Sequence, residues 1–446
     1  MNNFLSTVES PSRCTVRPDE RSTAVILALC LLLFVDVELP FVGSSNRLIA
    51  LAIIAFVILG RRDLPISTPF TGAVAVLIPL YYLLPPLVHP EDDAHNFAAV
   101  FVFQMACVGA MLLLANVMAE ANTRERLVDL LILFAAVSAV VAIMQWYGVA
   151  GALGRERWIH ATVSSSTLRL RGAGFLADPN FMAILLASTL PLIINWRFTR
   201  LRWPVLAVII LGINTTNSRS GIILAMLAVL LSVAARSSFR TAIASVKGRR
   251  AVFGLVACLI ALFAFNVGGQ RDRVIEGVFI GLGIKTAPGG VVDREAANSA
   301  LYRREIVQPW FEVGVENFPF GSGLAAQDKV VQKVQIPLGA HNTFVQSFAQ
   351  GGMAGLLISF TSIWCLLFFI RRRTEPFAIM GIVFVISGMV LSWPGLVFIV
   401  LPMGLADGIR AGQLGVPAPR SHRTPAGATF KGVQSERESV AARFPQ

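Results

Sequence analysis

The sequence predicts an all-α fold, a polytopic transmembrane helical bundle of about twelve spans with a large loop on one side. Hydrophobic residues make up 55% of the 446 residues, and charged residues only 14%. The apolar residues fall in unbroken runs instead of alternating or striped patterns. A helix needs roughly 17–25 such residues to cross a hydrocarbon core, where every backbone polar group must be bonded within the segment.

The apolar runs divide the chain into tails, spans and one long loop. We expect spans, to within several residues, at 22–39, 46–60, 69–88, 96–118, 127–149, 178–195, 203–217, 220–235, 251–267, 342–370, 376–392 and 393–409. The organisation that follows is a cytoplasmic N-terminal tail (1–21), nine spans (22–267), a large outside loop (268–341), three spans (342–409) and a disordered cytoplasmic tail (410–446).

Basic residues mark every second connection, which orients the bundle. Arginine and lysine are concentrated in cytoplasmic loops. Here the basic connections are 60–63, 124–126, 197–202, 236–250 and 371–373. Both termini are therefore expected in the cytoplasm. The net charge of +12 therefore reflects the membrane topology, with anionic membrane lipids as its partner. The sequence has no basic soluble domain, so we expect no nucleic-acid partner.

Cysteine spacing indicates neither disulfides nor a metal centre. The five cysteines form no close pair, so we expect no disulfide framework and no zinc site; they are Cys14, Cys30, Cys107, Cys258 and Cys365.

Arginines stand at outside positions that the charge rule does not explain. The knot at 215–221 joins two spans on the outside and contains Arg219, and Arg169 and Arg171 precede another outside helix start. The Asp178–Pro179 pair is a good helix start, with an N-cap and a first-turn proline. A lone arginine near a span end can extend to the headgroups. Several together favour a cavity that binds an anion, because a guanidinium at bilayer depth costs about 2.5–3.5 kcal/mol and its planar fork fits phosphate.

The large loop holds an amphipathic stretch at 298–323. Its apolar residues fall on one helical face, which predicts one or two short helices at the membrane surface, interrupted at Pro309. These apolar positions are Ile306, Val307, Trp310, Phe311 and Gly314.

His341 ends the large loop where the tenth span begins. Asn342, Gln346 and Gln350 follow at four-residue steps, so they share one stripe that should face protein or water. From the residues alone, His341 fits a functional role and a helix cap equally. The other histidines lack such a context and are read as structural; they are His89, His95, His160 and His422.

Four stretches together resemble the superfamily of O-antigen ligases and polymerases, which are polytopic bacterial glycosyltransferases. They are "RGAGFLADPN" (171–180), "NSRSG" (217–221), "YRREIVQPWFEVGVENFPFGSG" (302–323) and "HNTFVQSFAQGGMAGLL" (341–357). The resemblance implies a fold similar to type C glycosyltransferases and a polyprenyl-diphosphate-linked donor. It also implies a place in the bacterial inner membrane, with the 268–341 loop and the active site in the periplasm. It also implies that Arg171 and Arg219 bind the diphosphate and that His341 is catalytic. Arg303 and Arg304 occupy a place where the family has one arginine, so either is a candidate.

The chemistry of the residues agrees with this resemblance. A sugar bonded to diphosphate has a good leaving group, so transfer needs charge stabilisation and a base for the acceptor hydroxyl. Arginines can stabilise the charge without a metal. The sequence near the motifs has no clustered carboxylates of the kind that bind Mg²⁺. We therefore expect metal-independent, inverting transfer without a cofactor. Asn180, Asn342 and Gln346 are expected to line the substrate cavity.

The predicted function is a membrane glycosyltransferase that moves a lipid-linked oligo- or polysaccharide to an outside acceptor. A ligase would use the lipid A core as acceptor. A repeat-unit polymerase would use another lipid-linked glycan or a growing exopolysaccharide, and the motifs do not separate the two. A polysaccharide or anion transporter is the alternative from another class. It would require repeat symmetry and broken helices; the sequence has no such repeat, and the candidate residues cluster on one side.

Overall fold

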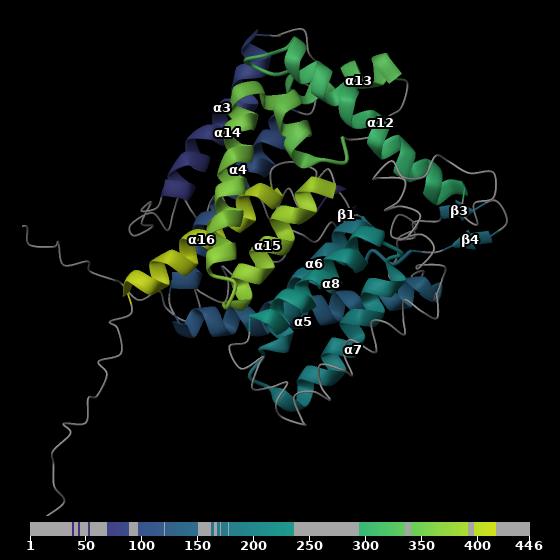
Figure 1. Cartoon of the computed structure of the whole chain (residues 1–446), viewed down its shortest axis with the longest axis vertical. Coiled ribbons are helices and arrows are strands. Elements are labelled where there is room, and N and C mark those ends of the chain that lie inside the picture. Colours follow the sequence, from purple (N-terminus) through teal and green to yellow (C-terminus); the bar gives the residue numbers. More distant parts are fainter. Residues whose placement is uncertain are drawn as a thin grey trace, which may run out of the picture.

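The computed structural model is helical over most of its described length (Figure 1). It describes residues 38–39, 43–44, 52–53, 69–88, 97–119, 121–149, 162–164, 167–169, 171–176, 178–235, 294–334, 340–390 and 397–415. The longer helices are α3 (Pro69–Val88), α4 (Phe97–Ala119), α5 (Ala121–Trp146), α6 (Pro179–Ile194), α7 (Thr199–Thr215), α8 (Arg219–Ala234), α12 (Arg294–Glu316), α14 (Thr343–Arg371), α15 (Pro376–Val390) and α16 (Val397–Gly415). Two short elements, η4 (Gly323–Ala325) and α13 (Ala326–Val334), follow α12.

Strands are confined to two short antiparallel pairs in the described residues. β1 (Glu38–Leu39) pairs with β2 (Gly43–Ser44), and β3 (Thr162–Ser164) pairs with β4 (Thr167–Arg169). The predicted all-α class is thus confirmed for the bundle itself.

The helices coincide with the predicted spans from 69–88 onward, except that the span at 251–267 lies outside the described residues. Of the predicted span at 22–39, only the last two residues are described, in β1, and of 46–60 only residues 52–53, which are helical. Some helices run past the apolar part: α5 begins at Ala121 and α16 continues to Gly415. Apolar runs predict the membrane-embedded part of a helix, whereas its polar turns continue beyond it.

Two helices are long and apolar enough to cross a membrane by themselves, the Thr123–Trp146 part of α5 and the whole of α14. Other apolar helices in the described part are shorter. The C-terminal half of α14 carries four large apolar side chains at three- and four-residue steps, and each is between 45% and 64% exposed; they are Leu357, Phe360, Trp364 and Leu367. A stripe of large exposed apolar side chains is typical of a surface that lipid or another chain covers. The number of spans remains a prediction.

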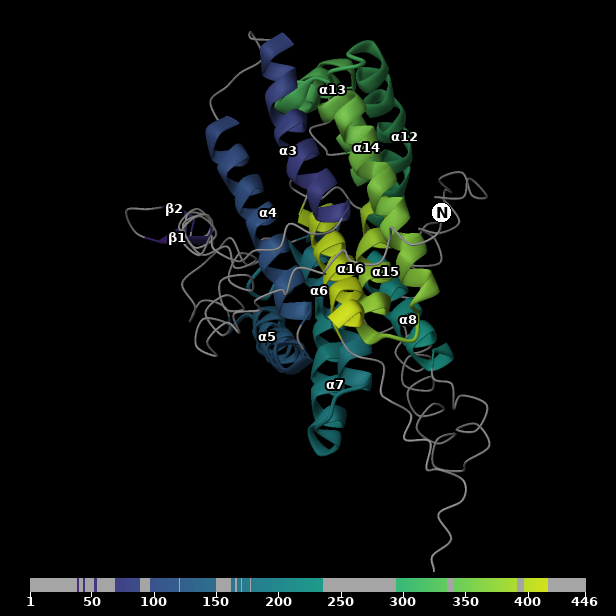
Figure 2. The same cartoon turned by 90° about the vertical axis from the view of Figure 1, so that its left-hand side faces the viewer.

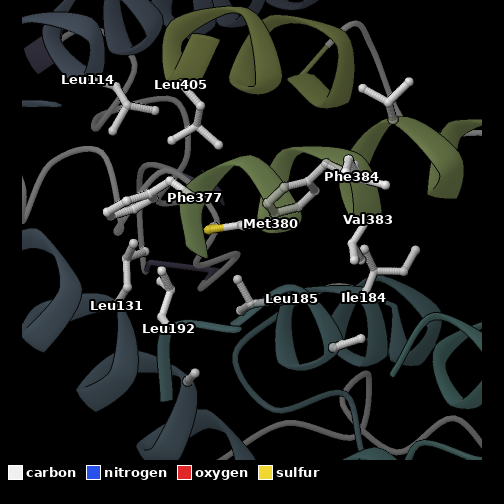
Figure 3. Close-up of a cluster of buried hydrophobic side chains, with 14 of the residues drawn as sticks. Leu114, Leu131, Ile184, Leu185, Leu192, Phe377, Met380, Val383, Phe384 and Leu405 are labelled. Atoms are coloured by element: carbon white, nitrogen blue, oxygen red, sulfur yellow. The ribbon is translucent and has the colours of Figure 1, made fainter. Parts of the chain in front are cut away.

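Helix α6 lies at the centre of the packing, in contact with α5, α7, α8 and α15 (Figures 1 and 2). Figure 3 shows how α15 crosses it. Ile184 of α6 lies by Val383 and Phe384 of α15, whereas Leu192 lies toward Phe377. The two helices therefore run in opposite directions, and the end of α15 meets the start of α6.

Helix α16 packs closely along α4 through small residues. A Cβ atom at Gly408 would lie 2.2 Å from the Cβ of Met118, and one at Gly404 would lie 2.9 Å from Met111. Small residues let helix backbones approach closely, which favours helix association where lipid removes the hydrophobic driving force.

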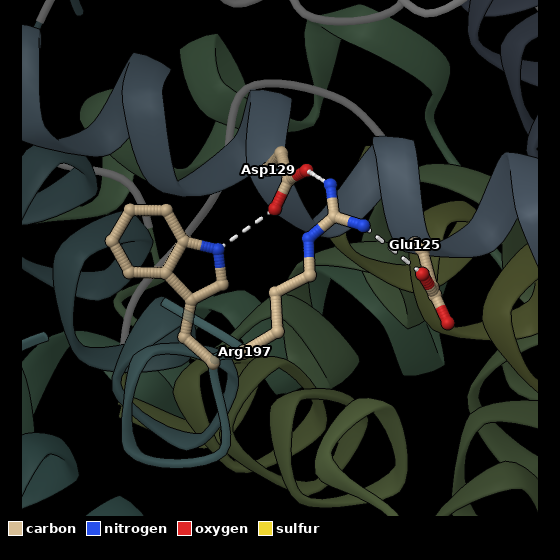
Figure 4. Close-up of polar contacts among 4 residues, drawn as sticks. Glu125, Asp129 and Arg197 are labelled. Atoms are coloured by element: carbon tan, nitrogen blue, oxygen red, sulfur yellow. Dashed lines mark hydrogen bonds and ion pairs between the residues drawn. The ribbon is translucent and has the colours of Figure 1, made fainter. Parts of the chain in front are cut away.

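A polar cluster joins α5 to the α6–α7 connection (Figure 4). Trp196 Nε1 donates to Asp129 Oδ1 at 2.7 Å, and the Arg197 guanidinium pairs with Asp129 and, at 3.2 Å, with Glu125. Two connections that the charge rule predicts on the inside therefore meet at one end of the bundle. Helices α6 and α8 begin at the opposite end, which we call the site end.

Candidate functional site at the starts of α6, α8 and α14

The turn that carries Arg171 is tied to two helix ends. Arg171 Nε donates to the Thr216 carbonyl at 2.9 Å, and Nη2 donates to Asn180 Oδ1 at 3.1 Å. The Gly172 N–H donates to the Thr215 carbonyl at 3.0 Å. Two acceptors fix the plane of the half-buried guanidinium. The structure thus brings the 171–180 and 215–221 motifs together, as a shared anion site requires.

Arg219 is the first residue of α8. Ser218 caps this helix, since its Oγ accepts from the Gly221 N–H at 3.2 Å, and Asn217 has a left-handed backbone with φ 52°. A Cβ at Gly221 would lie 2.3 Å from the Cβ of Ala183, so α6 and α8 begin in close contact. A helix N-terminus favours negative charge and disfavours a cation. An arginine held there is consistent with an anion as its ligand.

Helix α6 begins as predicted. Asp178 is its N-cap and accepts from the Asn180 N–H at 2.6 Å, with Pro179 in the first turn. Asn180 was predicted in the substrate cavity; its Oδ1 accepts from Arg171, so the structure gives it a contact that orients the guanidinium.

Asn342, and not His341, caps α14. The Asn342 side chain accepts from the N–H groups of Phe344 at 3.0 Å and Val345 at 3.2 Å. His341 precedes the cap with φ 50°, a left-handed conformation that is uncommon outside glycine and is enriched at functional positions. The helix-cap interpretation of His341 is therefore wrong, and its functional role stays a prediction.

His341 lies at the same end of the bundle as the two arginines. A Cβ at Gly388, near the end of α15, would lie 3.7 Å from Thr343 in the first turn of α14. Helix α15 runs antiparallel to α6 and also contacts α8. Its C-terminal end therefore lies near the starts of α6, α8 and α14.

The glutamines of the polar stripe of α14 differ in their hydrogen bonds. Gln350 Oε1 accepts from the hydroxyl of Tyr81 in α3 at 2.7 Å. The buried Oε1 of Gln346 has no hydrogen-bond partner among the described residues. An acceptor left open in this way fits the predicted cavity lining, because buried polar groups are nearly always satisfied by protein, water or ligand.

Helix α14 is broken at Gly352, which has φ 53° and ψ −124°. The loop 317–322 fills the break: Ser322 N–H donates to the Ala349 carbonyl at 2.9 Å, and Met353 N–H donates to the Pro319 carbonyl at 2.8 Å. The groups that the break frees are therefore bonded by the large loop, which fixes that loop to α14.

Helix α12 runs without interruption through Pro309, contrary to the prediction. Ile306, Trp310 and Val313 are buried and face a small cluster formed with α13 and α14. Pro309 has no N–H to donate to the carbonyl of Glu305, one turn earlier, and Glu305 is an exposed residue. The apolar face thus packs on protein, whereas Phe311 is 52% exposed.

Arg303 and Arg304 both belong to α12. Their side chains lie outside the described part of the chain, so the choice between them stays open. In the described part no group of three His, Cys, Asp or Glu side chains could hold a metal ion. Metal independence remains a prediction.

Sequence reasoning missed Gln145 in α5. It is buried (1% exposed), and its side chain bonds the turn that follows Arg171. A single amide inside the apolar run "VVAIMQWYGV" was the available signal, since polar side chains within spans usually face protein partners.

Comparison with known families agrees with this geometry. Residues 204–360 match the family model described as O-antigen ligase, whose members are membrane-embedded glycosyltransferase-type enzymes. The matched segment contains Arg219, His341 and the break at Gly352, while Arg171 lies before it. No curated protein matches the chain at a significant level. This match over residues 204–360 supports the resemblance of the chain to the O-antigen ligases and polymerases.

Proposed function

We propose that the protein transfers a glycan from a polyprenyl diphosphate, such as undecaprenyl diphosphate, to an acceptor hydroxyl on the outer side of the bacterial inner membrane. The observation that carries this proposal is the junction of the Arg171 turn with the 215–219 knot at the paired starts of α6 and α8. A diphosphate bound here would meet the Arg171 guanidinium and the N-termini of α6 and α8, with Arg219 as the first residue of α8.

The proposed chemistry is a direct displacement. The bond between sugar C1 and the diphosphate oxygen breaks while the acceptor oxygen bonds to C1, which inverts the anomeric configuration. Arg171 and Arg219, with Arg303 or Arg304, stabilise the negative charge of the departing lipid diphosphate. His341 accepts the proton of the acceptor hydroxyl. Asn342 and Gln346 line the cavity, and Asn180 orients Arg171.

The lipid A core is the proposed acceptor, which makes the protein a ligase. A repeat-unit polymerase remains the second candidate, because the matched family supports both. The break in α14 is a feature that a transporter would also have. The enzyme is favoured over a transporter because the family match is to transferases and the loop fills the break with backbone hydrogen bonds.

The test is transfer by purified protein in EDTA, with a lipid-linked glycan donor and either a lipid A core acceptor or a second lipid-linked glycan. A ligase labels the first acceptor, and a polymerase elongates the second. Product linkages opposite in configuration to the donor are expected, with the rate unchanged by EDTA. No transfer to either acceptor, with donor bound and carried across vesicles instead, would refute the proposal in favour of a transporter.

Surface glycans of a strain that lacks the gene provide an independent check. Full-length lipid-linked polymer left unattached indicates a ligase, single capped repeats indicate a repeat polymerase, and loss of a secreted polysaccharide indicates an exopolysaccharide polymerase. Unchanged glycans would contradict all three.

A further inference from the structure

Gln145 binds one turn with both ends of its side-chain amide. Its Oε1 accepts from the N–H groups of Ala173 at 2.8 Å and Gly174 at 2.9 Å. Its Nε2 donates to the Gly174 carbonyl at 3.0 Å. A buried glutamine in an apolar helix needs partners for these groups, and all three of these bonds go to the residues that follow Arg171.

The turn lies directly on the backbone of α5. A Cβ at Gly172 would lie 2.3 Å from the Ala142 carbonyl oxygen, and one at Gly174, where φ is 59°, would lie 2.8 Å from the Ser138 carbonyl oxygen. No side chain fits between turn and helix at these two positions. Gln145 therefore bonds the turn from α5, whereas Thr215 and Thr216 bond it and Arg171 from the end of α7.

The geometry points to Gln145 as a positioning residue that holds Arg171 at the donor diphosphate. This inference rests on the function proposed above. With Gln145 in place, the turn is bonded to both α5 and the end of α7, so the Arg171 backbone has little freedom to move away from Thr216 and Asn180. Misplacing a substrate-binding group by about 1 Å can reduce a rate by about a hundredfold, so a clamp of this kind has a large effect on transfer.

The test compares Gln145→Met with Gln104→Met. Methionine keeps the length of the side chain and removes all three bonds. Gln104 is a second buried glutamine (1% exposed), in α4, and serves as the matched control for loss of a buried amide. Hydrogen exchange of the backbone amides at 171–176 can be measured without the lipid-linked glycan donor. We expect it to rise at least about tenfold in Gln145→Met and to stay unchanged in Gln104→Met.

Transfer from the lipid-linked donor shows whether the clamp acts through Arg171. Gln145→Met should lower transfer about tenfold in the parent and have no further effect in an Arg171→Lys background, because coupled residues are non-additive. Equal losses in both backgrounds would reduce Gln145 to a general stability role. Unchanged exchange at 171–176 would overturn the clamp itself.

A second variant covers the case in which Gln145→Met does not fold. Gln145→Glu keeps an acceptor for both amides and loses only the donor to Gly174, so it should show a smaller rise in exchange. Exchange equal to that of the parent in this variant would also overturn the inference. If the parent transfers no glycan at all, the proposed function fails, while the exchange experiment still decides whether Gln145 holds the turn.

Discussion

Replacing Gly321 by alanine should detach the large loop from the break in α14. Gly321 has φ 80°, and a Cβ there would lie 2.4 Å from the Gln350 carbonyl oxygen and 2.5 Å from the Gly352 nitrogen. Both neighbours are backbone atoms, which no side-chain rotation can move. The loop 317–322 must therefore shift away from α14.

The magnitude follows from three contributions to the free energy of unfolding. A residue with a Cβ loses about 1–2 kcal/mol in the left-handed region. Overpacking against a fixed neighbour costs about 1–3 kcal/mol. The two loop-to-break hydrogen bonds, at 2.9 Å and 2.8 Å, contribute about 1 kcal/mol each. If the loop moves away, the clash is relieved but both hydrogen bonds are lost. The free energy of unfolding then falls by about 3–4 kcal/mol, a large part of the roughly 5–15 kcal/mol that stabilises a typical domain.

Gly323→Ala is the matched control. Gly323 also has a left-handed backbone, with φ 59°, but a Cβ there meets only the Pro85 side chain at 3.1 Å. The difference between the two variants isolates the clash. Thermal unfolding in detergent should show a midpoint several degrees lower for Gly321→Ala than for Gly323→Ala. Hydrogen exchange at 317–322 and 349–354 should rise in Gly321→Ala only. Equal midpoints and equal exchange in the two variants would refute the reasoning.

Three further predictions concern the site and the topology. His341→Asn should give a folded protein that binds the donor but transfers about 10²- to 10⁴-fold more slowly, and transfer within a few-fold of the parent would make His341 structural. Asn342→Ala removes the cap of α14 and should lower the free energy of unfolding by about 0.5–2 kcal/mol, so an unchanged thermal midpoint would contradict the assigned cap. A reporter fused near residue 290 should lie outside, with fusions near 243 and after 410 inside. A cytoplasmic residue 290 would place the proposed site in the wrong compartment.

Local signals explain what the sequence predicted well. Apolar runs long enough for a membrane predict the helices, and the Asp178–Pro179 pair predicts the start of α6 because capping depends on neighbouring residues only. The two arginine motifs were expected to share a ligand, and Arg171 does bond both the 215–221 knot and the start of α6.

Contacts between distant residues explain what the sequence did not predict. The break at Gly352 depends on Pro319 and Ser322 of the large loop, and a pair of glycines is equally typical of close helix packing. Gln145 bonds a turn more than twenty residues away, so its spacing carries no motif. His341 was weighed as a cap because it precedes the span, but its neighbour Asn342 makes the bonds.

Transfer by Arg219→Lys tests the central claim most directly. Lysine keeps the charge at the start of α8 but replaces a planar fork with a compact ammonium that cannot make a bidentate contact to phosphate. Purified Arg219→Lys is expected to remain folded and to lose most of its transfer from a lipid-linked donor. Near-normal transfer by the lysine variant would contradict the diphosphate role and favour an arginine that only extends to the headgroups.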